Sequence, residues 1–359
     1  MTGGTVRIMD ACGASAPVYA VEIKSSAANT NVTDGTFEIM PTHAAAGDVA
    51  TQLILTTASF GNLIINRAVD CASDLQLNTY PLIVRKNLTL TSGTLLANNL
   101  DVTVGGNFVL SAGTTYNSGT NNTRFNGNTD QTFTLTGTVN NGAAGLRNLA
   151  IDKSSGTLSL AGTQTDLTVQ GNLDLTNGTL DDNGKTVYVA GDIVNSGNHI
   201  STPGTGLISM NGTTTQTISG NGNGTFNNLA LANTNAAAAP VSLSANITVN
   251  GILTFSGNKS FNIGTYNLRL AASASIVSGD ATSYIQTSGN SGDGGLTKIY
   301  SAASSSFAFP IGAPTITPAR AVKYSPATIS INGTPGAFGS ITVIPVGYEH
   351  PATVVNGVS

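Results

Sequence analysis

Apolar and polar residues alternate in short runs along most of this 359-residue chain. Alternation places every second side chain on one face, which is typical of β-strands with one buried side. Asn-Gly and Ser-Gly pairs separate the runs, and Asn and Gly accept the positive φ angles that tight turns need. The pattern predicts an all-β protein. The clearest runs are residues 88–90, 102–104, 173–175, 187–189 and 268–270.

Longer stretches of the sequence recur. Asn62, Asn148 and Asn228 each begin an Asn-Leu-x-Ile/Leu segment. Residues 87–95 likewise match residues 172–180 at nearly the same spacing. Self-similarity at a fixed period indicates a repeat architecture. The chain thus contains about three copies of a unit of about 80 to 86 residues.

Each unit has a finer period. In the first two units, Asn or Asp residues follow one another at steps of roughly 20 residues. A period near 20 residues with two or three short strands describes one coil of a parallel β-solenoid, whose coils stack about 4.8 Å apart. Amide side chains form ladders in such stacks, so these residues are predicted to form a structural Asn ladder. They are Asn87, Asn107, Asn126, Asn172, Asp192 and Asn211.

We therefore expect a right-handed parallel β-helix, or β-solenoid, over residues 60–303, with roughly 11 or 12 coils and a length on the order of 55 Å. Leu88 and Phe108 are expected to share an inward-facing row. Residues 1–59 are strand-like but lack the period, so they are predicted to form an N-terminal β segment or cap. Residues 304–359 are Pro-rich, and we expect a cap or the start of a β-sandwich-like domain there.

Charge is scarce in this chain. Asp, Glu, Lys and Arg make up 9% of the residues and give a net charge of −4, against roughly 25% charged residues in ordinary domains. Like charges stacked one strand apart repel each other, so a solenoid accounts for the scarcity. The balance excludes a basic nucleic-acid surface, and few ionisable groups argue against a typical enzyme. Without a run of 18 apolar residues, no membrane insertion of this segment is predicted.

The two cysteines are Cys12 and Cys71. They are too few for a disulfide scaffold or a cysteine zinc site. One bridge that pins the N-terminal segment and two buried free thiols are the alternatives, and the composition is typical of an extracellular setting. The chain begins without an apolar signal region, so we expect it to be a segment of a longer protein.

No constellation of catalytic residues is evident. His43, His199 and His350 lie far apart, and neither a nucleophile elbow nor a P-loop is present. We therefore predict no catalytic, cofactor-binding or metal-ligating residues and no enzymatic activity. Because some β-helical polysaccharide lyases and hydrolases use clustered carboxylates, a carbohydrate-active enzyme is the alternative. The carboxylates that would serve it are Asp166, Asp174, Asp181, Asp182 and Asp192.

Two features permit more than one interpretation. Residues 181–184, Asp-Asp-Asn-Gly, faintly resemble a calcium loop. They lack the bidentate Glu that closes such a loop, so an Asn-Gly turn is the preferred interpretation. Tyr116, Tyr266, Tyr284 and Tyr300 are either stacking platforms for sugar rings or ordinary sheet-facing residues, and we prefer the second.

A family resemblance emerges at residues 309–312, Phe-Pro-Ile-Gly, which open a stretch of Pro- and Thr-rich strands. With the Asn-Leu-x-Leu coils and the Ser/Asn-Gly-Thr-Leu turns, the chain resembles the repetitive β-helical regions of very large Bacteroidota surface proteins. These include gliding-motility adhesins exported by the type IX secretion pathway. The resemblance covers about residues 60–345. It implies an extracellular location on the bacterial cell surface and no catalytic residues.

The leading hypothesis is therefore a non-enzymatic structural or adhesive segment that acts as a rigid stalk in adhesion or gliding. Its neutral polar surface would contact surface glycans or polysaccharide weakly at many places. A self-assembling extracellular filament subunit, joined to further copies through strand edges, is a second alternative. Nucleic acid is not an expected partner.

Overall fold

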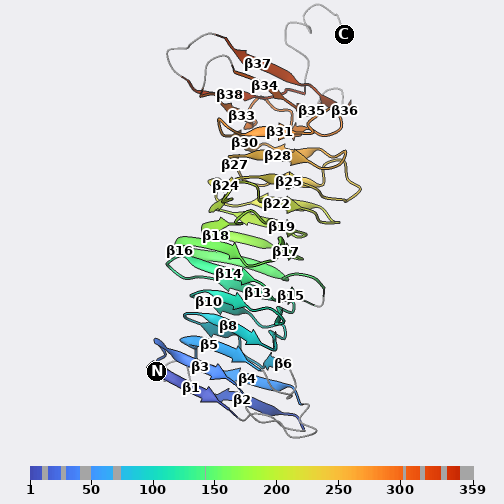
Figure 1. The fold of residues 1–359 in the computed structure, drawn as a ribbon. Helices are drawn as coiled ribbons and strands as arrows, with labels where there is room; N and C mark the ends of the chain where they lie inside the picture. The colour runs from blue at the N-terminus through green and yellow to red at the C-terminus, as the bar shows by residue number, and fades with distance from the viewer. Residues whose placement is uncertain are drawn as a thin grey trace, which may run out of the picture. The chain divides into compact units, whose positions relative to one another are not determined.

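The computed structural model describes residues 1–9, 15–25, 30–40, 50–67, 74–141, 143–301, 305–315, 320–332 and 338–347. All regular elements in these ranges are β-strands, which stack in parallel as a β-solenoid of about 11 turns (Figure 1). The predicted all-β parallel β-helix is thus confirmed. No described segment forms a helix that would be long and apolar enough to cross a membrane. The chain divides into two compact units, Met1–Tyr188 with Thr202–Gly206, and Val189–Ser201 with Leu207–Ser359.

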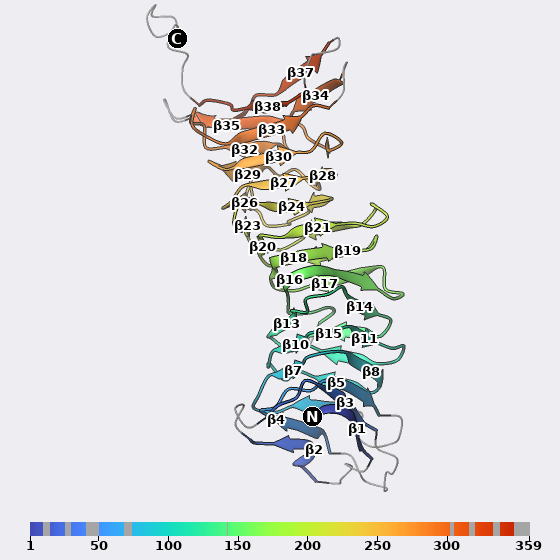
Figure 2. The same cartoon turned by 90° about the vertical axis from the view of Figure 1, so that its left-hand side faces the viewer.

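In the first unit the strands stack in three columns, one on each side of the coil (Figure 2). Column 1 holds β7 (Leu82–Val84), β10 (Val102–Val104), β13 (Asn122–Phe125) and the first parts of β16 (Asn148–Ala161) and β18 (Leu173–Asp181). Column 2 holds β1 (Thr2–Ile8), β3 (Asp34–Ile39), β5 (Asn62–Asn66), β8 (Leu88–Ser92), β11 (Phe108–Leu110), β14 (Gln131–Leu135) and the last parts of β16 and β18. Column 3 holds β2 (Val18–Ile23), β4 (Gln52–Thr56), β6 (Asp74–Leu77), β9 (Thr94–Leu96), β12 (Thr115–Asn117) and β15 (Thr138–Asn140), then β17 (Asp166–Val169) and β19 (Thr186–Val189).

The second unit also contains three columns of parallel strands. One holds β20 (Ile193–Asn195), β23 (Gln216–Ser219), β26 (Val241–Leu243), β29 (Phe261–Gly264), β32 (Ile285–Thr287) and β35 (Ile311–Thr315). The next holds β21 (Asn198–Ile200), β24 (Gly224–Phe226), β27 (Ile247–Val249), β30 (Asn267–Leu270) and β33 (Gly295–Ile299). The last holds β22 (Leu207–Met210), β25 (Leu229–Leu231), β28 (Ile252–Phe255) and β31 (Ser275–Val277).

Antiparallel pairing appears towards the C-terminal end, beside the last parallel pair, β32 with β35. There β34 (Ser305–Phe309) pairs with β37 (Ala327–Ile331), β35 with β36 (Arg320–Tyr324), and β33 with β38 (Ser340–Val343). At the other end of the chain, β1 to β4 already belong to columns 2 and 3. The first turn is longer than later ones, since Val6 pairs with Phe37 and Val18 with Gln52. This long first turn helps to explain why the finer period is not visible before residue 60.

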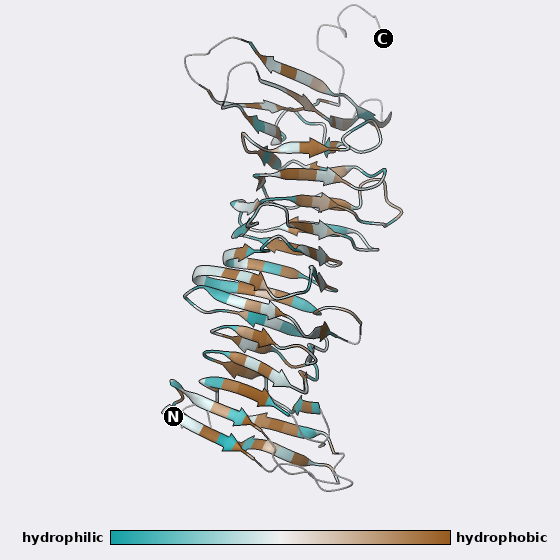
Figure 3. Cartoon of the chain, viewed as in Figure 1, coloured by the Kyte–Doolittle hydropathy of each residue, from teal (hydrophilic) through white to brown (hydrophobic). Residues whose placement is uncertain are grey.

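The core lies inside the coil, and in most strands alternate residues are buried. Figure 3 shows hydrophobic and hydrophilic bands along the strands. Leu88 and Phe108 pair in column 2 as predicted, and both side chains are buried. The Phe108 ring stacks on Phe133 with a centroid distance of 5.1 Å and meets Tyr116 edge to face at 5.1 Å. The Phe108–Phe133 pair joins two successive turns, whereas Tyr116 packs against Phe108 within one turn, and both contacts stabilise the core.

The long repeat does not contain a whole number of turns. β16 and β18 each turn a corner and so count as two strands. The matching segments in β8 and β18 then lie eleven strands apart along the chain, as do those in β18 and β28. Eleven is not a multiple of three. In the first unit, the copy in β8 accordingly lies in column 2 and the copy at the start of β18 in column 1.

Candidate functional site

An Asn row connects successive turns through side-chain to backbone hydrogen bonds. The Asn62 Oδ1 accepts from the Asn87 N–H (3.3 Å), and the Asn87 Oδ1 accepts from the Asn107 N–H (2.8 Å). The Asn107 Oδ1 in turn accepts from the Thr132 N–H at 2.8 Å. Each side chain thus satisfies a backbone donor at the corner of the next turn. The role is structural, because the carbonyl oxygen of each of these amides is already engaged.

The second copy of the predicted ladder makes bonds of the same kind. In the first unit, the Asn148 Oδ1 accepts from the Asn172 N–H at 2.9 Å. In the second unit, the Asp192 Oδ1 accepts from the Thr217 N–H at 2.7 Å. An aspartate fits here because the position uses only an acceptor oxygen.

The row differs from the predicted ladder at the last member of each copy. Asn126 is exposed and follows β13 in column 1, where its N–H donates to the Val104 carbonyl at 3.2 Å. Thr132 in column 2 holds the next place after Asn107. Asn211 likewise donates its N–H to the Val189 carbonyl at 3.0 Å. The step from Asn107 to Asn126 therefore crosses to another side of the coil instead of completing a turn.

Buried polar pairs recur at equivalent positions of the three repeats. Arg67, Lys153 and Asn233 hold the same place after the Asn that begins each repeated segment, and each donates to the Oε1 of a buried glutamine. The Lys153 bond to Gln131 is 2.6 Å long and the Asn233 bond to Gln216 is 2.8 Å long; Arg67 contacts Gln52.

The glutamines also fasten neighbouring backbone. Gln131 accepts from the Gly127 N–H at 3.0 Å, and its Nε2 donates to the Val104 carbonyl at 3.1 Å. Gln216 repeats this arrangement with Gly212 (2.9 Å) and Val189 (2.9 Å). These pairs were not among the sites predicted from the sequence. In the sequence, such a pair could be recognised by a polar residue at one of the inward-facing positions of an alternating strand. Gln131 is an example, because it faces inward like Phe133, two residues later.

Several lysines turn inward onto backbone carbonyls. The Lys153 Nζ donates to the Gly127 (2.9 Å) and Thr129 (2.8 Å) carbonyls, and the side chain is 1% exposed. Burial lowers the pKa of Lys153, and the nearby Asp130 carboxylate offsets part of that effect.

Two other lysines do the same. In the first unit, the Lys185 ammonium contacts the Gly162 (3.1 Å) and Gln164 (2.7 Å) carbonyls. In the second, Lys298 donates to three carbonyls at 2.6 to 2.8 Å, and burial lowers its pKa as well. Some of the few charged residues therefore stabilise the fold from inside, by donating hydrogen bonds to backbone carbonyls. The three acceptors of Lys298 are Ala271, Ala272 and Ala274.

The aspartates considered for catalysis have separate surroundings. Asp181 accepts from the N–H groups of Asn183 and Thr202, both at 2.9 Å, while the fully buried Asp182 accepts from Gly184 at 2.9 Å. Asn183 and Gly184 have φ angles of 51° and 78°, as a tight Asn-Gly turn requires.

The remaining aspartates considered for catalysis do not form a cluster with Asp181 and Asp182. Asp166 is exposed in β17, and Asp192 belongs to the Asn row of the second unit. Asp174 is half-buried in β18; burial raises its pKa, and Arg124 opposes this shift. Within the described ranges, no group of three His, Cys, Asp or Glu side chains is arranged to hold a metal ion.

The other candidates are placed as follows. His199 is fully buried, and its Nδ1 accepts from the Asn227 N–H at 3.3 Å. Tyr116, Tyr284 and Tyr300 are buried, which removes them as open platforms for sugar rings, and Tyr266 is half-buried. The thiols Cys12 and Cys71 and the imidazoles His43 and His350 lie outside the described residues.

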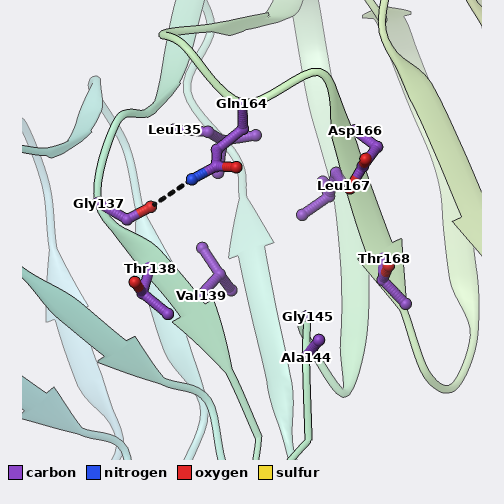
Figure 4. A pocket seen from close by; sticks show the side chains of 10 residues that line it. All are labelled: Leu135, Gly137, Thr138, Val139, Ala144, Gly145, Gln164, Asp166, Leu167 and Thr168. Carbon is purple, nitrogen blue, oxygen red and sulfur yellow. Dashed lines mark hydrogen bonds between the residues drawn. The ribbon is translucent and has the colours of Figure 1, made fainter. Parts of the chain in front are cut away.

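A cleft of about 210 Å³ opens on column 3 of the first unit, between β15 and β17 (Figure 4). β15 ends one six-stranded sheet and β17 begins the next, so an edge of each sheet lines the cleft. Leu135, Val139 and Leu167 contribute apolar lining, and Thr138, Gln164, Asp166 and Thr168 contribute hydroxyl, amide and carboxylate groups.

Both ends of the cleft are crossed by hydrogen bonds. At one end the Gly145 N–H donates to the Val139 carbonyl (3.0 Å), and the Leu146 N–H donates to the Thr168 carbonyl (2.8 Å). At the other end the exposed Gln164 side chain donates to the Gly137 carbonyl at 3.4 Å. The first closure is made by backbone groups. At the second, the Gln164 backbone N–H also donates to the Leu135 carbonyl at 3.0 Å, and the bond from the Gln164 side chain is the longer of the two.

Comparison with protein-family models, with curated proteins and with solved structures found no match.

Proposed function

We propose that this chain is a non-enzymatic structural or adhesive segment of a secreted bacterial surface protein, in which the solenoid serves as a stiff stalk. The observation that carries the proposal is the parallel stacking of strands within each unit, which is continuous in columns 1 and 2 of the first unit and in the three columns of the second. Every turn is joined to the next by backbone hydrogen bonds on up to three sides, so bending the stack would strain all columns together. The resemblance to gliding-motility adhesins supports a location on the cell surface.

The use of the ionisable groups supports the same proposal. An active site draws on groups that converge with open coordination or perturbed pKa values in a cleft. Here Lys153, Lys185 and Lys298 are engaged with backbone carbonyls, and Asp181 and Asp182 with turn N–H groups. These groups are committed to turns, which favours a structural role over a carbohydrate-active enzyme.

Small-angle X-ray scattering of the isolated chain tests the stalk. The expected result is an elongated particle, with stacked coils about 4.8 Å apart, whose cross-section stays constant with concentration. A compact scattering envelope would contradict the proposal. Growth of the particle with concentration would favour the self-assembling filament instead.

Two assays test the adhesive role and the enzyme alternative. Beads coated with the chain should bind bacterial surface polysaccharide or cells more than beads coated with chain that has been heat-unfolded. A polysaccharide panel should show no release of reducing ends. Release that disappears in Asp181→Ala, while the variant keeps its β-sheet circular dichroism, would establish the enzyme and overturn the proposal.

A further inference from the structure

The two strand edges at the cleft of column 3 carry backbone groups aimed across it. In β15, Thr138 donates its N–H to the Thr114 carbonyl of the preceding turn at 2.8 Å. Backbone groups alternate along a strand, so those of Val139 point the other way, toward the cleft. The bond from Gly145 to the Val139 carbonyl confirms this direction. The Val139 N–H therefore lies along the free edge.

The opposite edge follows the same rule. In β17 the Thr168 carbonyl accepts from Leu146 on the cleft side, while the residue before β17, Thr165, accepts from Thr186 on the other side at 3.2 Å. By alternation the N–H and C=O of Asp166 and the N–H of Thr168 point into the cleft. In the described part of the chain, neither β15 nor β17 pairs with another strand along this stretch.

The chain itself shows what fits between the edges. Residues 144–146 lie between β15 and β17, where Leu146 forms a parallel bridge with Val169 and Ala144 an antiparallel bridge with Asn140. This short piece of backbone thus contacts both edges at once. The cleft continues beyond it, with further edge groups available, as far as Gln164, whose side chain donates to the Gly137 carbonyl and whose backbone N–H donates to the Leu135 carbonyl.

From this arrangement we infer that the cleft is a docking site for an extended peptide, which adds as a strand next to β15 and β17. Pairing along a sheet edge supplies main-chain hydrogen bonds, while small pockets select alternate side chains. Leu135, Val139 and Leu167 would contact a small apolar side chain of the peptide. Asp166 at the rim would favour a neighbouring Lys or Arg. The inference concerns a partner peptide and does not depend on the stalk function.

Amide-resolved hydrogen exchange tests the site with defined probes. The probe is a capped pentapeptide, Val-Thr-Val-Lys-Val, and the matched control carries Pro at its centre and so lacks one N–H. The probe should slow exchange at Val139, Asp166 and Thr168, and the control should slow it less. Tyr116, in the interior strand β12, should exchange slowly with or without either peptide.

One substitution separates docking from folding. Val139→Pro removes an N–H that column 3 does not use, and Pro is tolerated on an edge strand. It should raise the Kd of the probe by about 3- to 10-fold, as expected for one hydrogen bond, with a thermal midpoint near that of the wild-type chain. Thr138→Pro, which removes the bonded N–H, should instead lower the midpoint. Asp166→Lys should weaken the probe, and replacing its Lys by Glu should restore binding.

Three results would overturn the inference. The first is an absence of slowed exchange at the three amides while the wild-type chain is folded and the probe is in excess. The second is equal affinity of the probe for wild type and a folded Val139→Pro variant. The third is protection of the same amides by an oligosaccharide but not by the peptide, which would assign the cleft to a glycan.

Discussion

Replacing Lys153 by Met should destabilise the middle of the first unit without affecting the rest of that unit. Met keeps the long apolar stem but removes an ammonium that donates to the Gly127 and Thr129 carbonyls and to the Gln131 Oε1. Buried acceptors that lose their partner cost about 1 to 3 kcal/mol each. Gln131 still accepts from the Gly127 N–H, and the desolvation cost of the ammonium disappears. Local stability should therefore fall by about 2 to 4 kcal/mol.

Hydrogen exchange followed by mass spectrometry measures this effect locally, which suits a repeat protein whose parts open separately. Peptides covering residues 127–135 and 149–161 should exchange about 30- to 700-fold faster, at about tenfold per 1.4 kcal/mol. Lys86→Met is the matched control, because Lys86 is 46% exposed and pairs with the exposed Asp34. Equal exchange in Lys153→Met and Lys86→Met would refute the view that the inward lysine stabilises the coil.

Two further predictions concern the same internal groups. Because burial lowers the pKa of Lys153 below its ordinary 10.5, the unfolded chain binds more protons between the folded value and 10.5. The free energy of unfolding of the wild type, relative to Lys153→Met, should then grow as pH rises through that window and level off above it. Urea titrations at several pH values measure this difference. If it shrinks at alkaline pH, the carbonyls stabilise the ammonium more than burial destabilises it. In the Asn row, Asn107→Ala should cost about 1 kcal/mol by leaving the Thr132 N–H without its acceptor, whereas Asn126→Ala should be close to neutral; chemical denaturation with equal losses in the two variants would contradict the row described here.

The local alternation of apolar and polar residues predicted the strands, and the period near 20 residues predicted their parallel stacking. Strand alternation is a short-range property, so runs such as residues 88–90 and 102–104 specify their inward side without help from distant residues. The pairing of Leu88 with Phe108 follows because one turn of the predicted period separates them. Turn length then varies, since Phe108 pairs with Phe133 across a longer turn. A fixed period therefore predicts that Asn126 lies in the same row as Asn107, whereas the two residues lie on different sides of the coil.

The candidate sites were harder to predict, for physical reasons. A lysine such as Lys153, between Asp152 and Ser154, looks like a solvated turn residue until the carbonyls of the preceding turn are brought beneath it. Only its inward parity, after Leu149 and Ile151, gives a hint. The cleft is hidden in the same way. It depends on residues 144–146 separating two strands that elsewhere in column 3 would pair, and such spacing is a tertiary effect.

Because the repeat contains eleven strands and the coil has three sides, an added repeat lengthens the stack but starts on a different side of the coil. In the first unit, the copy that starts in β18 begins two sides further round the coil than the copy in β8. A surface residue kept in both of these copies would lie on two different sides of the coil and would not form a stripe. Repetition of this unit therefore does not build a binding surface along one side of the coil, but it does increase the length of the stack. Duplication of one sequence repeat would lengthen the stack and keep its inward-facing rows, because the strands on all three sides use the same two-residue alternation.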